Sequence, residues 1–327
     1  MKIVALIAVL TLLLASQGSA QKIYQDYTLS KDTVHYGPGS NEVFPPANKG
    51  YTLLLPDNGR EPAGTVLLLE DDKPNLSDTA NIHQPANTRG WAALYISTGI
   101  PVDLYFSESS LACTDSLIKE VFSRYHLPNK NIFLVGVMTS GHRALKYIEY
   151  CKKGKSLFNP SIKGVVLCES AIDWVRQWYE CQKQVRDNTS RVGFFEGNFI
   201  TYLFARHIKA TPAGDIQKFI DFSPYSYFDT KMEKPKLYKD LSIRAYTYAD
   251  IRYWFSAQGK GIYDSNYPDM SGFINEQVLV GNKNASLIAY SSSLTEPLWG
   301  NMRKQSLTWN LINKKELVEW MIKSAGM

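Results

Sequence analysis

Short apolar runs, separated by turn residues, recur along most of the chain. Because they are mostly apolar and only five to seven residues long, they are typical of strands buried on both faces of a parallel sheet. A further apolar run, 51–55, precedes a turn at 56–59 and would lead into the run at 65–69. The predicted strands are 51–55, 65–69, 91–97, 132–137, 162–168, 243–248 and 286–290.

Helical patterns lie between several of these strands. Apolar residues with helical spacing occupy 118–125 and 144–151. A last helix is predicted after Asn313, which stands three residues before Glu316 in capping-box spacing. This alternation predicts an α/β fold, a doubly wound and mostly parallel sheet.

The stretch 171–241 interrupts the alternation. It is rich in Trp, Tyr and Phe and contains no run that fits the sheet. An insertion at the carboxyl edge of a parallel sheet lies over the crevice where such folds bind ligands. We therefore predict a helical lid at 171–241, between core segments 21–170 and 242–327.

Residues 1–20 resemble a secretory signal, with one early Lys, an apolar run and a small-residue end before Gln21. They predict export, to the periplasm or the exterior. No later stretch is apolar for long enough to span a bilayer. In an oxidising compartment Cys113, Cys151, Cys168 and Cys181 could form one or two disulfides in several pairings or stay free thiols.

Composition excludes some classes of function. The net charge of +5 is spread along the chain, which argues against nucleic-acid binding, and 44% hydrophobic residues can fill a large core. The cysteines lack metal-ligand spacing, and no phosphate-binding glycine motif is present, so neither a metal nor a cofactor is predicted.

Four segments resemble the α/β-hydrolase superfamily, and in particular its secreted bacterial esterase- and peptidase-like members. They are "NIFLVGVMTSGHRALKYIEY", "GWAALYISTG", "GVVLCESAIDW" and "NLINKKELVEWM". The resemblance implies a serine nucleophile at a sharp strand-to-helix turn, an acid after a later strand and a histidine after the last strand.

The residues at these three places depart from that pattern. The nucleophile position is Met138, the acid position is Asp250, and the histidine position falls near Leu307. The five histidines are at 35, 83, 126, 142 and 207, so none follows the last predicted strand. Asp250 has a second interpretation as a helix cap. The predicted strand 65–69 ends in "LLLEDDKP", where acidic side chains would oppose an oxyanion.

Two residues offer a fallback for catalysis. Ser140 lies in the turn, although a serine there more often caps the helix, and His83 follows the acidic turn at the same sheet edge. Five residues are predicted to contact a ligand beneath the lid: Glu169, Asp173, Trp174, Trp178 and His142.

The sequence therefore predicts a pseudoenzyme, an exported and non-catalytic protein of hydrolase type that binds a small-molecule, peptide or lipid-like ligand under its lid. One alternative is an active serine hydrolase, an esterase or peptidase, that uses Ser140 with a displaced histidine. Another is an interaction protein whose lid presents Trp and Tyr anchors to a partner.

Overall fold

The computed structural model describes residues 22–56, 61–78, 81–188, 190–291 and 307–327. Its centre is one eight-stranded sheet with the order β1-β2-β4-β3-β5-β6-β7-β8. The β1–β2 and β2–β4 pairs are antiparallel, and all other neighbours are parallel. This confirms the predicted doubly wound, mostly parallel sheet. The strands are β1 (Ile23–Leu29), β2 (Asn48–Leu54), β3 (Thr65–Glu70), β4 (Ala92–Thr98), β5 (Ile132–Val137), β6 (Ile162–Cys168), β7 (Ser242–Tyr248) and β8 (Ala285–Tyr290).

The seven predicted strands are all present, whereas β1 was not predicted. Its sequence IYQDYTL is polar at several positions, and none of its residues is fully buried. It pairs only with β2, at the edge of the sheet. An edge strand with no fully buried face lacks the apolar run by which the inner strands are recognised.

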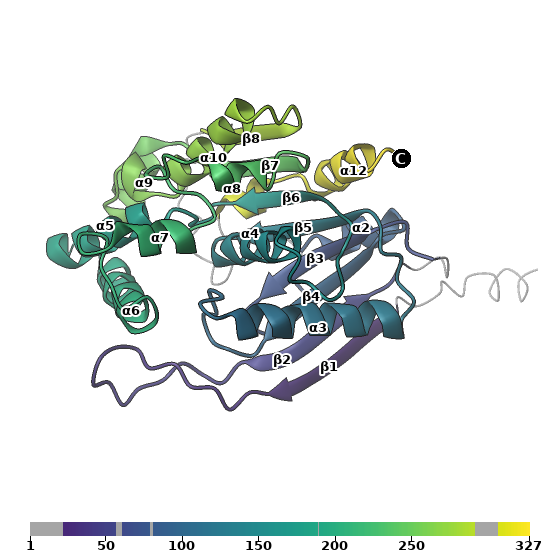
Figure 1. The fold of residues 1–327 in the computed structure, drawn as a ribbon, viewed down its shortest axis with the longest axis horizontal. Coiled ribbons are helices and arrows are strands. Elements are labelled where there is room, and N and C mark those ends of the chain that lie inside the picture. The colour runs from purple at the N-terminus through teal and green to yellow at the C-terminus, as the bar shows by residue number, and fades with distance from the viewer. Residues whose placement is uncertain (1–21, 57–60, 79–80, 189, 292–306) are drawn as a thin grey trace, which may run out of the picture.

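Helices cover both faces of the sheet (Figure 1). Apolar residues of α3, α4 and α10 share one core with the sheet, while those of α2 and α12 share a second core on the other face. Asn313 caps α12 by accepting hydrogen bonds from the backbone N–H groups of Lys315 and Glu316, as the sequence predicted. The helices outside the insertion are α2 (His83–Thr88), α3 (Glu108–Arg124), α4 (Thr139–Lys152), α9 (Ile251–Gln258), η1 (Ile262–Asp264), α10 (Tyr267–Leu279), α11 (Leu307–Leu311) and α12 (Lys314–Ser324).

Between β6 and β7 the chain forms a group of helices beyond the carboxyl end of β6. Figure 1 shows α5, α6 and α7 gathered at this end of the sheet. They have an apolar core of their own, in which Trp174 and Trp178 pack with Phe204 and Phe219. The helices are α5 (Trp174–Asp187), α6 (Arg191–His207), α7 (Ile216–Phe222) and α8 (Glu233–Lys236). We call this segment the insertion.

All four cysteines are free thiols, and those at 168 and 181 are buried. Within the described ranges, none of the helices combines the length and the apolarity needed to cross a bilayer. The predicted signal, residues 1–20, lies outside the described residues.

Candidate functional site

The turn between β5 and α4 has a backbone shape that fits few residue types. Met138 occupies it with φ 54° and ψ −120°, a region that residues with a Cβ rarely adopt. Two glycines permit the strand and the helix to approach each other. A Cβ on Gly136 would lie 2.3 Å from Cα of Gly141, and one on Gly141 would lie 1.9 Å from Oγ of Ser170. The turn is therefore a tight elbow that projects residue 138.

Two side chains define the chemistry of this elbow. Met138 is 48% exposed. Ser140 is buried instead, and its Oγ accepts a hydrogen bond from the N–H of Val137 at 2.7 Å and donates one to the carbonyl of Val137 at 2.9 Å. The Ser140 hydroxyl thus closes the end of β5 and does not face outward.

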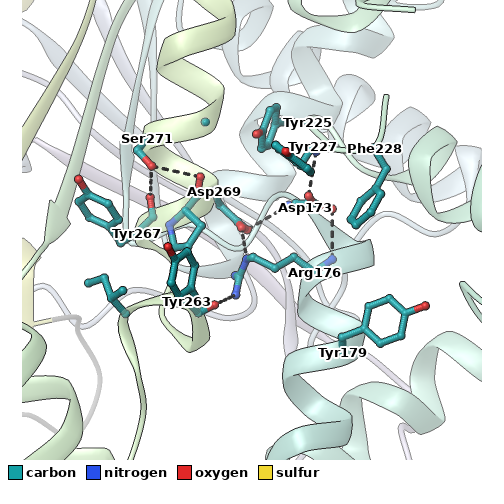
Figure 2. A pocket seen from close by; sticks show the side chains of 13 residues that line it. Asp173, Arg176, Tyr179, Tyr225, Tyr227, Phe228, Tyr263, Tyr267, Asp269 and Ser271 are labelled. Carbon is teal, nitrogen blue, oxygen red and sulfur yellow. Dashed lines mark hydrogen bonds and ion pairs between the residues drawn. The ribbon is translucent and has the colours of Figure 1, made fainter. Parts of the chain in front are cut away.

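A pocket of about 540 Å³ lies between the insertion and α10 (Figure 2). Its walls are aromatic, and Figure 2 shows them on opposite sides of the charged side chains that form the floor. Met138 is not among the lining residues, so the pocket is separate from the elbow. The aromatic walls consist of Tyr179 on α5, Tyr225, Tyr227 and Phe228 after α7, and Tyr263 and Tyr267 near the start of α10.

The floor of the pocket is a buried network of charges. Arg176 on α5 forms an ion pair with Asp269 on α10, and its guanidinium also donates to the Tyr263 carbonyl and to Oδ1 of Asn266. Asp173 accepts hydrogen bonds from backbone amides, including that of Arg176, as the N-cap of α5. Burial and the neighbouring Asp269 raise the pKa of Asp173 to about 6. Among the described residues, no group of His, Cys, Asp and Glu could hold a metal ion.

Solved structures with similar folds include several hydrolases. An S-formylglutathione hydrolase from Agrobacterium tumefaciens superposes with a TM-score of 0.54 at 8% identity, over 95% of this chain and 98% of that chain. Esterase B from Lactobacillus rhamnosis gives 0.51 at 10% identity, over 99% and 93% of the two chains. A Pyrobaculum calidifontis esterase gives 0.50 at 12% identity, over 98% and 90%.

The chain has the α/β-hydrolase fold. No family model and no curated protein sequence matches it. At these identities the structural likeness establishes the fold, while activity depends on the residues at the site.

Asp250, for which the sequence left the roles of triad acid and helix cap open, follows β7 and caps α9. Its carboxylate accepts the backbone N–H groups of Arg252 at 2.9 Å and Tyr253 at 3.2 Å. Leu307, near the expected histidine position, is the first residue of α11, and residues 292–306, which precede it, lie outside the described residues.

Two histidines near the sheet edge are engaged elsewhere. His142 is fully buried, with Nε2 2.9 Å from the carbonyl of Leu104, while Nδ1 accepts a hydrogen bond from Nε1 of Trp174 at 2.9 Å. These partners assign the neutral tautomer with the proton on Nε2, and burial lowers the pKa of His142. His83 is buried in α2, on the opposite face of the sheet from α4, 3.4 Å from the hydroxyl of Tyr95.

The acidic turn after β3 is tied to the elbow helix. Arg143 of α4 is buried, forms an ion pair with Asp71, and donates to the carbonyls of Leu69 and Asp103. Asp72 accepts hydrogen bonds from Asn48. The turn therefore carries structural contacts and differs from a freely solvated loop.

Glu169 follows β6 and is buried at the carboxyl edge of the sheet. Its Oε1 accepts hydrogen bonds from the N–H of Tyr248 at 2.5 Å and from the hydroxyl of Thr308 at 2.8 Å. Burial raises the pKa of Glu169 to about 7, and these hydrogen bonds offset only part of the effect. The carboxyl group thus joins β6, β7 and α11.

The predicted ligand contacts and the pocket coincide at one residue. Asp173 lines the pocket, whereas Trp174 and Trp178 lie in the core of the insertion, and His142 and Glu169 are buried among protein groups. The tyrosines of the walls were not predicted. They are contributed by three separate segments, and only their clustering in space, which no local pattern encodes, distinguishes them from other tyrosines.

Proposed function

We propose that this chain is an exported, non-catalytic ligand-binding protein built on the α/β-hydrolase fold. One observation carries the proposal: the elbow keeps its strained backbone and its two close-packed glycines, yet the residue it projects is Met138. A thioether has no proton to surrender to a base and cannot form an acyl intermediate.

The other residues near the elbow support this proposal. Ser140 uses its hydroxyl to close the end of β5, and both ring nitrogens of His142 are occupied. Removing the nucleophile or the histidine of a comparable triad lowers turnover by about a million-fold. A chain without either residue at its usual place is therefore expected to be nearly inert in hydrolysis.

The aromatic pocket supports a binding function. Its volume of about 540 Å³ lies within the range of small-molecule sites, and its walls are apolar rings around a few fixed polar groups. We propose that a small molecule, or the end of a peptide or lipid-like chain, occupies it. The insertion would act as one wall of this site.

A fluorophosphonate probe for serine hydrolases tests the absence of catalysis. The purified mature protein and Ser140→Ala are treated with the probe, and intact mass detects any adduct. We expect no adduct on either protein. An adduct on the wild type that disappears in Ser140→Ala would establish Ser140 as an activated nucleophile and overturn the proposal.

Two further measurements address binding and export. A ligand screen by thermal shift should find compounds that raise the melting temperature, and these shifts should diminish in Tyr227→Leu, because this ring lines the pocket. The mass of the protein recovered from the exported fraction of its host should correspond to a chain that begins at Gln21.

A further inference from the structure

The aromatic pocket holds more negative than positive charge. Arg176 is committed to Asp269, to the Tyr263 carbonyl and to Asn266, so its charge is already matched by one carboxylate. Asp173 is a second carboxylate in the lining. Four protein donors hold it in place, but all four are neutral, and they do not cancel its charge.

A third carboxylate stands beside the pocket. Glu276 lies on α10 one helical turn beyond Gly272, and residues four apart on a helix share a face. A Cβ on Gly272 would lie 2.0 Å from the hydroxyl oxygen of Tyr225, so the end of this ring rests against α10 next to Glu276. In the part of the chain that the structure describes, the Glu276 carboxylate has neither a hydrogen bond nor an ion-pair partner.

The titration of these groups agrees with the geometry. Burial, together with Asp229 and Asp173, raises the pKa of the half-buried Glu276 to about 7. Burial and three carboxylates, Glu276, Asp173 and Asp269, raise the pKa of Tyr225. Three carboxylates therefore lie near the Tyr225 phenol, and Arg176 balances the charge of only one of them.

Two lysines near α10 are engaged elsewhere. Helix α8 packs against α10, and its Lys234 donates to the backbone carbonyls of Ile220, Asp221 and Ser223. Lys183, on α5, forms an ion pair with Asp264. Neither ammonium group lines the pocket.

We propose that the aromatic pocket binds a small organic cation, an alkylated ammonium group held against the tyrosine rings and beside Asp173 and Glu276. This inference rests on the proposed ligand-binding function and specifies the class of ligand. The faces of aromatic rings attract cations, and alkylated ammonium groups lose little hydration when such rings enclose them. An anionic ligand would meet repulsion from the unmatched carboxylates, and a neutral one would leave them unmatched.

The rim of the pocket is suited to such a group. Tyr227 and Tyr263 are each 79% exposed, an unusual position for large aromatic side chains. Figure 2 shows Tyr227 and Tyr263 on different sides of Asp269, and both line the pocket, so a ligand between them would lie close to both rings. Both rings are therefore open to solvent, where an entering ligand can reach them.

Titration calorimetry with choline and its neutral isostere tests the proposal. In the isostere a quaternary carbon replaces the nitrogen, so shape is kept and charge is removed. At about pH 8 we expect choline to bind the wild type about tenfold more tightly than the isostere. Affinity for choline should fall by about five- to tenfold at about pH 5.5, because Glu276 and Asp173 take up protons over this range.

Variants assign the effect to the pocket. Glu276→Gln should weaken choline binding about fivefold and reduce its pH dependence, and Tyr227→Leu should weaken it by a similar factor without changing the pH dependence. Glu61→Gln is the matched control, because Glu61 is exposed before β3 and its loss changes the net charge equally. This control should bind choline as the wild type does.

The outcomes separate this inference from the proposed function. Equal affinity for choline and its isostere would overturn the cation inference and leave the ligand-binding function in place. If neither compound bound the folded protein, the cation inference would also be overturned. The ligand-binding function would then still be tested by the thermal-shift screen. An equal loss of affinity in Glu61→Gln and Glu276→Gln would show that overall charge, and not the pocket, attracts choline.

Discussion

The elbow makes a quantitative prediction about the stability of Met138 variants. At φ 54° and ψ −120° a residue with a Cβ is strained by about 1 to 3 kcal/mol, whereas glycine is not. Glycine costs about 0.5 to 1 kcal/mol in backbone entropy relative to alanine. Met138→Gly should therefore be more stable than Met138→Ala by about 1 kcal/mol. Both variants lose the rest of the same half-exposed side chain, so its contacts cancel in the comparison.

Urea denaturation followed by circular dichroism measures this difference, provided that both variants unfold with the same dependence on urea. Thr139, the first residue of α4, supplies the control, because its backbone is helical. There we expect the opposite order, with Thr139→Ala more stable than Thr139→Gly. If alanine were also the more stable residue at 138, the elbow would carry no Cβ strain and its description as a retained nucleophile turn would be wrong.

Three other predictions concern buried polar groups. Arg176→Met should lower the free energy of unfolding by about 3 kcal/mol, because Asp269 is left buried without its cation; a loss below about 1 kcal/mol in urea denaturation would contradict this. Burial raises the pKa of Glu169 from its ordinary 4.5 to about 7, so the folded state holds this proton more tightly than the unfolded chain does. The free energy of unfolding should therefore fall by about 3 kcal/mol as the pH rises from about 4.5 to about 7. Denaturation across this range should show a smaller fall in Glu169→Gln, and identical slopes would refute the assignment. Ser140→Ala should cost about 1 to 3 kcal/mol in urea denaturation because the N–H of Val137 loses its partner, and an unchanged stability would speak against that role.

Most of the sheet could be predicted from sequence because its inner strands are buried on both faces. In the sequence such strands are short apolar runs, and the alternation of these runs with helical patterns indicates a parallel sheet. Strand β1 gave no such signal, because it lies at the edge and keeps most of its side chains in contact with solvent.

The candidate site was less predictable, since its groups depend on contacts between distant segments. Position 138 could be identified from its spacing to Gly136, but the pocket could not, because Tyr227 and Tyr263 line one pocket only when the insertion packs near α10. For Asp250 the sequence left two roles open, and the contacts of its carboxylate in the structure are those of a helix cap.

The buried bond between His142 and Trp174 has a mechanical consequence. It joins the elbow helix to the first helix of the insertion through an imidazole and an indole that water does not reach. If α5 moved away from the sheet, the indole N–H of Trp174 and Nδ1 of His142 would each lose their hydrogen-bond partner in an apolar core. The bond therefore opposes a hinged movement of α5 away from the elbow, and under the proposed binding function a ligand would enter past the exposed tyrosines at the rim of the pocket.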